Sequence, residues 1–216
     1  MYDIILFDLD GTVIDSGEGI KNSARYTFAK LGFPAPTDEE LGDFIGPPLI
    51  DSFMRMCSFT REQAAHAVDI YREYYGEKGV YQIRIYAGLA ELIKKLHASG
   101  KTVALATSKY ELYAAQILKN LGLCEYFALI AGSLKDGGRG TKAEIIEYAL
   151  SALGAEDKKS AVMIGDRLHD IEGAKSAGID SIGVLYGFGT RKELESHGAT
   201  HIAATADDIY SIIMGK

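Results

Sequence analysis

The sequence predicts an α/β protein with a doubly wound parallel sheet that carries an inserted helical domain. Three observations support this fold class. Short apolar runs alternate with helical segments along most of the 216 residues, which is typical of a parallel sheet. A long stretch of helical signals interrupts this alternation after the first run. Polar and glycine-rich residues directly follow the apolar runs, where such sheets bind ligands.

Five apolar runs have the length and composition of buried strands, at residues 4–7, 103–106, 129–131, 162–164 and 182–184. Helical patterns occupy residues 89–96, 111–121, 143–153 and 171–177. The helix at 89–96 precedes the second strand, and the other three each follow a strand. This order predicts a core domain formed by residues 1–14 and 86–216.

The interruption, residues 15–85, is expected to form a helical cap domain. Thr37 with Glu40 and Thr60 with Gln63 have the spacing of capping boxes that begin helices. Gly32 and Gly76 are expected to end helices, because glycine tolerates the positive φ found there. Both connections of the insert lie at one edge of the predicted sheet, so we expect it to act as a lid.

Composition and charge favour a small ligand over a large polyanion. The formal net charge is −7 and no local basic patch is apparent, which argues against nucleic acid and anionic membranes as partners. Cys57 and Cys124 have no spacing typical of zinc or redox sites, so we expect them to pack in a reducing compartment. No targeting or membrane-spanning segment is apparent, and the expectation is a cytoplasmic protein that is a monomer or a dimer.

The strongest chemical signal is Phe7-Asp8-Leu9-Asp10-Gly11-Thr12, where an apolar run ends in two acids and a turn. Side chains alternate along an extended chain, so Asp8 and Asp10 are expected to face the same side. One carboxylate can attack phosphorus as a nucleophile, while the other handles the proton of the leaving group. An Asp-Gly pair alone could simply form a turn, so the interpretation depends on further motifs.

Three further motifs supply the other groups that this chemistry needs. Thr107-Ser108-Lys109 follows the second apolar run and offers a hydroxyl and backbone donors to a phosphoryl oxygen. Lys142 opens a helix, where its ammonium and the helix N-terminus both favour an anion. Asp166 and Asp170 follow the fourth run, and their hard oxygen ligands suit Mg²⁺.

In this order, the motifs resemble those of the haloacid dehalogenase-like hydrolase superfamily, in its phosphoglycolate phosphatase-like branch with a helical cap. The resemblance covers essentially the whole chain. It implies that Asp8 is the nucleophile and Asp10 the general acid/base of a phosphatase that forms an aspartyl-phosphate. It also implies that Mg²⁺ is bound by Asp8, Asp166 and the backbone carbonyl of Asp10, with Asp170 beside this site or bound to a metal water.

The resemblance extends to residues that would bind the substrate. Thr107, Ser108 and Lys142 would bind the phosphoryl group, and Gly46, Pro47 and Pro48, within Ile45-Gly46-Pro47-Pro48-Leu49, would form a cap loop that sets specificity. The lysine of this family is commonly followed by proline, whereas Ala143 follows Lys142. Lys135 is therefore a rival for the same role.

Several alternatives stay open. Asp10 favours phosphate monoesters, because the phosphonate-cleaving and dehalogenating relatives lack an acid there. A 5′-nucleotidase or a sugar-phosphate phosphomutase would use the same motifs. A non-catalytic receiver-like phospho-acceptor also surrounds an aspartate with acids, a hydroxyl and a lysine, although Asp10 and the insert argue against it. Five tyrosines could contact a nucleoside or simply pack: Tyr71, Tyr74, Tyr75, Tyr81 and Tyr86.

Overall fold

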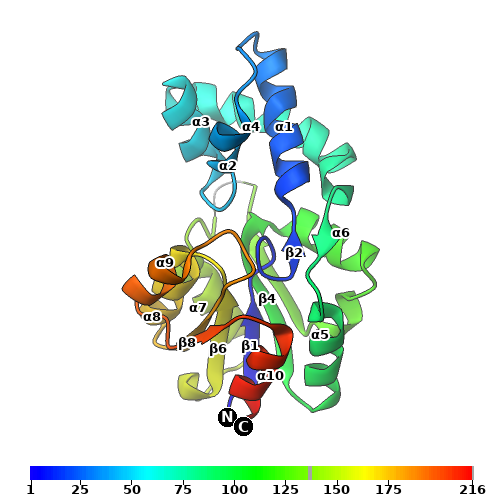
Figure 1. The fold of residues 1–216 in the computed structure, drawn as a ribbon, viewed down its shortest axis with the longest axis vertical. Coiled ribbons are helices and arrows are strands. Elements are labelled where there is room, and N and C mark those ends of the chain that lie inside the picture. Colours follow the sequence, from blue (N-terminus) through cyan, green and yellow to red (C-terminus); the bar gives the residue numbers. More distant parts are fainter. Residues whose placement is uncertain (136–137, 216) are drawn as a thin grey trace. The chain divides into compact units, whose positions relative to one another are not determined.

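The computed structural model describes residues 1–135 and 138–215. They divide into two compact units (Figure 1). The core unit comprises Met1–Asp15 and Ile85–Lys216, and the inserted unit comprises Ser16–Arg84. The short strands β2 (Ile14–Asp15) and β3 (Arg84–Ile85) lie at the two points where the chain passes between the units.

The core unit is built on a six-stranded sheet with the order β5-β4-β1-β6-β7-β8. Its ladders are all parallel, so the predicted doubly wound parallel sheet is confirmed. A sixth strand, at the β8 edge, was not predicted. The strands are β1 (Ile4–Phe7), β4 (Thr102–Tyr110), β5 (Leu129–Ser133), β6 (Ala161–Gly165), β7 (Asp180–Val184) and β8 (His201–Ala203).

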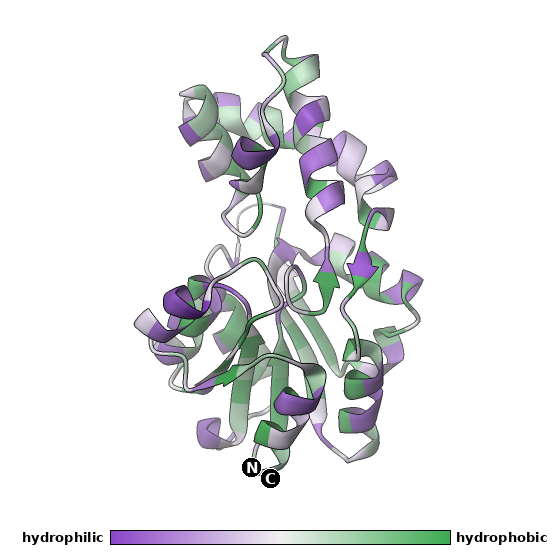
Figure 2. Ribbon diagram, viewed as in Figure 1, coloured by the Kyte–Doolittle hydropathy of each residue, from purple (hydrophilic) through white to green (hydrophobic). Residues whose placement is uncertain are grey.

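The register places β1 at the centre of the sheet. Ile4 pairs with Thr102 of β4 on one side and with Ala161 of β6 on the other. The carboxyl ends of β1, β4 and β6 therefore meet at one edge. The strands are rich in apolar residues, as Figure 2 shows, because both faces of the sheet are covered by helices.

The helices of the core unit cover both faces of the sheet, as the sequence alternation requires. Helices α7 and α8 pack on one face, where Leu6, Ala104 and Met163 meet Ile146 and Ala174. Helices α5 and α10 lie together on the opposite face (Figure 1). The helices are α5 (Leu89–Ala98), α6 (Glu111–Asn120), α7 (Lys142–Ala152), α8 (Leu168–Ala177), α9 (Arg191–Ser196) and α10 (Ala206–Met214).

The inserted unit is helical, with α1 (Gly17–Lys30), α2 (Asp38–Gly42), α3 (Leu49–Cys57) and α4 (Arg61–Glu77). Both expected capping boxes are present, at the starts of α2 and α4. Gly32 follows α1 with a φ of 74°. The expectation for Gly76 is wrong, because it lies inside α4, which continues to Glu77.

An aromatic cluster forms the centre of the inserted unit. The ring centroids of Phe44 and Phe53 are 4.8 Å apart, and Phe28 lies 6.2 Å from Phe53. This unit thus has its own core, in which large rings supply much of the buried apolar area.

Both cysteines are free, and Cys124 is exposed, so its expected packing role is wrong. Among the described residues, no helix is long and apolar enough to cross a membrane.

Candidate active site

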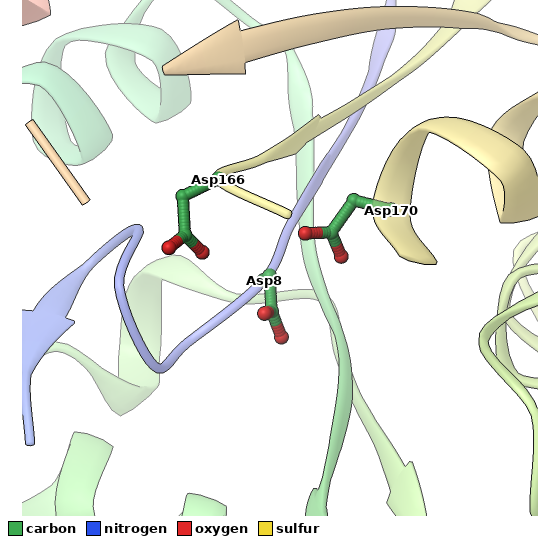
Figure 3. A group of neighbouring side chains, drawn as sticks. All are labelled: Asp8, Asp166 and Asp170. Carbon is green, nitrogen blue, oxygen red and sulfur yellow. The ribbon is translucent and has the colours of Figure 1, made fainter. Parts of the chain in front are cut away.

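The predicted acids gather at the carboxyl edge of the sheet. Asp8 follows β1, Asp166 follows β6, and Asp170 lies in the first turn of α8. Figure 3 shows the three side chains as neighbours, with Asp166 and Asp170 on either side of Asp8. One oxygen from each can be chosen so that all three lie within 4.8 Å of one another. A helix that begins at Leu168 places Asp170 where its Oδ2 accepts a hydrogen bond from Arg167 N at 3.1 Å.

Backbone geometry fixes the position of Asp166. Its Oδ2 accepts a hydrogen bond from Phe188 N at 2.7 Å, and Thr12 Oγ1 donates to its Oδ1 at 3.3 Å. Gly11 has a φ of 81°, and a Cβ at this position would lie 2.2 Å from Asp166 Oδ2. Only glycine therefore permits the turn after Asp10 to approach this carboxylate so closely.

Burial and repulsion from neighbouring carboxylates make two of these acids, Asp8 and Asp166, harder to ionise than usual. Burial, and then the charges of Asp170 and Asp8, raises the pKa of Asp166 to about 8. Burial also raises the pKa of Asp8 to about 6, although the neighbouring Lys142 opposes the shift. Burial and the neighbouring carboxylates thus both disfavour the ionised forms of Asp8 and Asp166. Hard oxygen donors in such a group suit a divalent cation, so the residues present fit Mg²⁺.

Lys142 contacts two acids of this group, Asp8 and Asp170. Its Nζ is 2.9 Å from Asp8 Oδ1 and 2.8 Å from Asp170 Oδ1, and it donates a hydrogen bond to Ala106 O at 3.0 Å. Burial alone would lower the pKa of Lys142, but the charges of Asp170 and Asp8 outweigh it and raise the pKa. The lysine is therefore a permanent cation. Its rival Lys135 is exposed.

A second lysine, Lys109, contacts Asp10, the other acid of the first motif. Lys109 Nζ donates to both carboxylate oxygens of Asp10, at 2.9 Å and 2.8 Å. Both side chains are mostly buried. Lys109 belongs to the second motif, Thr107-Ser108-Lys109, but was not predicted as a site residue. A lysine directly after two hydroxyl residues at a strand end was the only signal for it.

The two hydroxyl residues before Lys109 have different surroundings. Thr107 is buried, and its Oγ1 accepts a hydrogen bond from Lys109 N at 3.2 Å. Ser108 is exposed. Thr107 directly follows Ala106, whose carbonyl oxygen accepts a hydrogen bond from Lys142.

Tyrosines from two loops line the first turn of the core unit. Tyr186 donates a hydrogen bond to Thr12 O at 3.1 Å, and its ring centroid lies 4.9 Å from that of Tyr86. Tyr86 N donates to Val13 O at 3.1 Å. Tyr186 had no sequence signal, since it depends on the return of the chain after β7.

The residues predicted for the cap lie in the inserted unit. Gly46 is exposed with a φ of 106°, and Pro48 is the residue before α3. Of the other tyrosines, Tyr71 and Tyr75 are buried and stacked, with centroids 5.5 Å apart. Their burial fits the packing alternative for these two positions.

Comparison with known proteins identifies the family of the chain. Residues 5–184 match the haloacid dehalogenase-like hydrolase family. The chain belongs to this family. A family relative from Pseudomonas aeruginosa, a 5′-nucleotidase, is 41% identical over 203 residues, covering 94% of this chain and 91% of the relative. The tyrosine-protein kinase PtkA of Mycobacterium tuberculosis is 35% identical over 208 residues, covering 95% of this chain and 70% of its own.

The fold of this family member also matches solved structures. The crystal structure of a protein described as a predicted phosphatase from Clostridium acetobutylicum superposes with a TM-score of 0.94 at 39% identity, and the match covers 100% of both chains. The protein is thus a hydrolase of the haloacid dehalogenase-like family.

Proposed function

We propose that this protein is a Mg²⁺-dependent phosphatase that hydrolyses a small phosphate monoester through an aspartyl-phosphate on Asp8. The observation that carries the proposal is the charge balance at the carboxyl edge of the sheet. Asp8 and Asp170 contact the ammonium of Lys142, Asp10 contacts that of Lys109, and Asp166 lies in one group with Asp8 and Asp170. When all six groups are ionised, before Asp10 takes up the proton that it later donates, the formal charge is −2, which one divalent cation would neutralise.

Asp8, Asp166 and the backbone carbonyl of Asp10 would hold the metal, with Asp170 beside them. When bound, Mg²⁺ would offset the negative charge that the phosphate brings into the site. The chain's own residues would place the reacting groups. Lys142, already at Asp8, would bind the phosphoryl oxygens together with Thr107 and Ser108.

The reaction would occur in two displacements. In the first, which Asp10 enters in its protonated form, an oxygen of Asp8 attacks phosphorus, the bond from phosphorus to the ester oxygen breaks, and Asp10 gives its proton to that oxygen. In the second, Asp10 takes a proton from water, which attacks phosphorus, and the bond from phosphorus to Asp8 breaks. Inorganic phosphate leaves, and both aspartates return to their starting state.

The inserted unit would act as the cap, with Gly46, Pro47 and Pro48 reading the organic part of the substrate. Two substrate classes compete. The resemblance to the phosphoglycolate phosphatase-like branch favours phosphoglycolate or a similar small acid, whereas the 41% identical 5′-nucleotidase favours a nucleoside monophosphate. Phosphomutase chemistry would use the same core residues.

The direct test measures phosphate release from p-nitrophenyl phosphate, phosphoglycolate and a nucleoside monophosphate. We expect turnover with Mg²⁺, loss with a chelator, and recovery when Mg²⁺ is returned. Asp8→Asn should abolish turnover without lowering the melting temperature. Full activity of Asp8→Asn, or of chelated wild type, would disprove the mechanism. Ranking the esters by kcat/KM would choose between the substrate classes. The cytoplasmic location and the oligomeric state stay predictions.

A further inference from the structure

The contact between Lys109 and Asp10 is more specific than a general balance of charge requires. The ammonium contacts both oxygens of this one carboxylate, at 2.9 Å and 2.8 Å. The Lys109 side chain is 8% exposed and that of Asp10 is 18% exposed. Screening by water is therefore weak, and the pair restricts the rotation of the Asp10 side chain.

An irregularity in β4 aims Lys109 at the site. Ala106 pairs with Ala131 and Tyr110 pairs with Ser133, so four steps along β4 match two steps along β5. The two additional residues form a bulge that spans Thr107, Ser108 and Lys109. Bulges of this kind redirect side chains, and they are frequent beside active sites.

The neighbouring strand is built to accept this bulge. A Cβ at Gly132 of β5 would lie 2.7 Å from Lys109 O and 2.7 Å from Glu111 Cα, so only glycine fits without a shift of backbone. Gly132 N donates to Glu111 Oε2 at 3.1 Å, and Arg139 Nη2 lies 2.7 Å from the same oxygen. Residues outside the acidic group, Gly132, Glu111 and Arg139, therefore hold the bulge in place.

We propose that Lys109 is a positioning residue for Asp10, which holds its carboxylate in the orientation needed for proton transfer to and from the substrate. This inference rests on the proposed function, because it presupposes that Asp10 is the acid and base. In the free enzyme both Asp10 oxygens contact Lys109. When substrate binds, one oxygen must turn to the leaving group while the other keeps its contact with Nζ. Lys109 thereby removes most of the rotational freedom of Asp10 before the reaction, which is how fixed orientation lowers a barrier.

The experiment compares two phosphate esters that differ in their need for a general acid. Ethyl phosphate leaves as a strongly basic alkoxide and needs the proton, whereas p-nitrophenyl phosphate leaves as a stabilised phenolate and needs it little. The readout is the ratio of kcat/KM for the two esters, measured on one protein sample. This ratio does not depend on the fraction of protein that is folded.

We expect Lys109→Met to lower kcat/KM for ethyl phosphate by about 10- to 100-fold and for p-nitrophenyl phosphate by about threefold or less. In an Asp10→Asn background, the same substitution should change the ethyl phosphate rate by about twofold or less, since residues that act as a unit are not additive. Lys109→Arg keeps the charge but moves the donors, so it should change the ratio in the same direction by less.

Lys101→Met is the matched control. The Lys101 side chain is also mostly buried, and it forms an ion pair with Asp3 at 2.8 Å, at the amino edge of the sheet. Its loss should lower stability and leave the ratio unchanged.

If Lys109→Met lowers kcat/KM for both esters by the same factor, the ratio is unchanged and the positioning role is overturned. This outcome leaves the proposed function intact if Asp10→Asn alone still slows ethyl phosphate selectively. If Asp10→Asn slows both esters equally, the role given to Asp10 in the proposed function is itself wrong, and the positioning role fails with it.

Discussion

Nζ of Lys142 lies 2.9 Å from Oδ1 of Asp8, and the Lys142 side chain is 4% exposed. A buried cation therefore already faces the proposed nucleophile in the free enzyme. Three elements hold it, because it also contacts Asp170 of α8 and Ala106 O of β4. A phosphoryl group at Asp8 would therefore meet a fixed positive charge, in a setting where solvent weakens the attraction little.

Lys142→Met should lower kcat/KM by about 10²-fold or more, as does the loss of one donor to a transition-state oxyanion. It should also lower the free energy of unfolding by about 3–5 kcal/mol, since two buried carboxylates lose their partner. Lys135→Met is the control, because Lys135 is exposed and should be silent in both measurements. The reverse result, with Lys135 essential and Lys142 dispensable, would favour the rival assignment.

The raised pKa of Asp166 predicts how the metal-free protein responds to pH. Burial, followed by the charges of Asp170 and Asp8, raises its pKa from 3.8 to about 8. The folded protein therefore binds this proton more tightly than the unfolded chain does. The resulting stability is fully present below pH of about 4 and is lost as the pH rises toward about 8.

Asp166→Asn cannot ionise, so it should escape this loss. In chelator, the melting temperature of the variant relative to wild type should rise steadily from acidic to mildly alkaline pH. Mg²⁺ should stabilise wild type more at alkaline pH, because it competes with protons for the carboxylates. Mg²⁺ should stabilise Asp166→Asn less than it stabilises wild type. A difference between variant and wild type that is constant with pH would show that Asp166 is ionised without a metal.

The sequence predicted the central strands because each is a short apolar run followed by polar residues. Residues 4–7 are β1 without any change of bounds, and the other four strands extend the predicted runs by a few residues. Strand β8 was missed because it has only three residues, His201–Ala203, and lies at the sheet edge, where burial is partial. Such an edge leaves little hydrophobic pattern to detect.

The convergence of Asp8, Asp166 and Asp170 followed from parallel topology, since adjacent strands end at one edge. The contact of Lys109 with Asp10 could not be predicted in the same way. It depends on a bulge in β4 whose extra residues are visible only when β4 and β5 are aligned by their hydrogen bonds. Similarly, Phe188 N reaches Asp166 through the return of the chain after β7, which no local pattern encodes.

The cap loop should control the choice of substrate and not the chemistry. Pro47→Ala would loosen the loop beside Gly46, whose φ of 106° suits glycine. We expect it to change the ranking of phosphate esters by kcat/KM, while the Mg²⁺ concentration for half-maximal activity stays the same. Pro34→Ala, at an exposed position of the same unit, is the matched control. An unchanged ranking would remove Pro47 from the specificity loop.

Gly132→Ala tests whether the bulge in β4 controls the Asp10 carboxylate through backbone alone. The new methyl group would need the space of Lys109 O and Glu111 Cα, both 2.7 Å from its ideal position, so β4 must shift. Overpacking of this kind typically costs about 1–3 kcal/mol of stability. Because the shift moves the backbone that carries Lys109, its ammonium should lose part of its contact with Asp10.

Gly132→Ala should therefore reproduce the selectivity of Lys109→Met without removing any charge, slowing ethyl phosphate more than p-nitrophenyl phosphate. Adding Lys109→Met to Gly132→Ala should then change the ratio of the two esters little further. Gly42→Ala is the control, since a Cβ there meets nothing within 4 Å. If Gly132→Ala lowers the melting temperature but leaves the ratio at the wild-type value, the bulge serves stability alone, and the position of Asp10 does not depend on it.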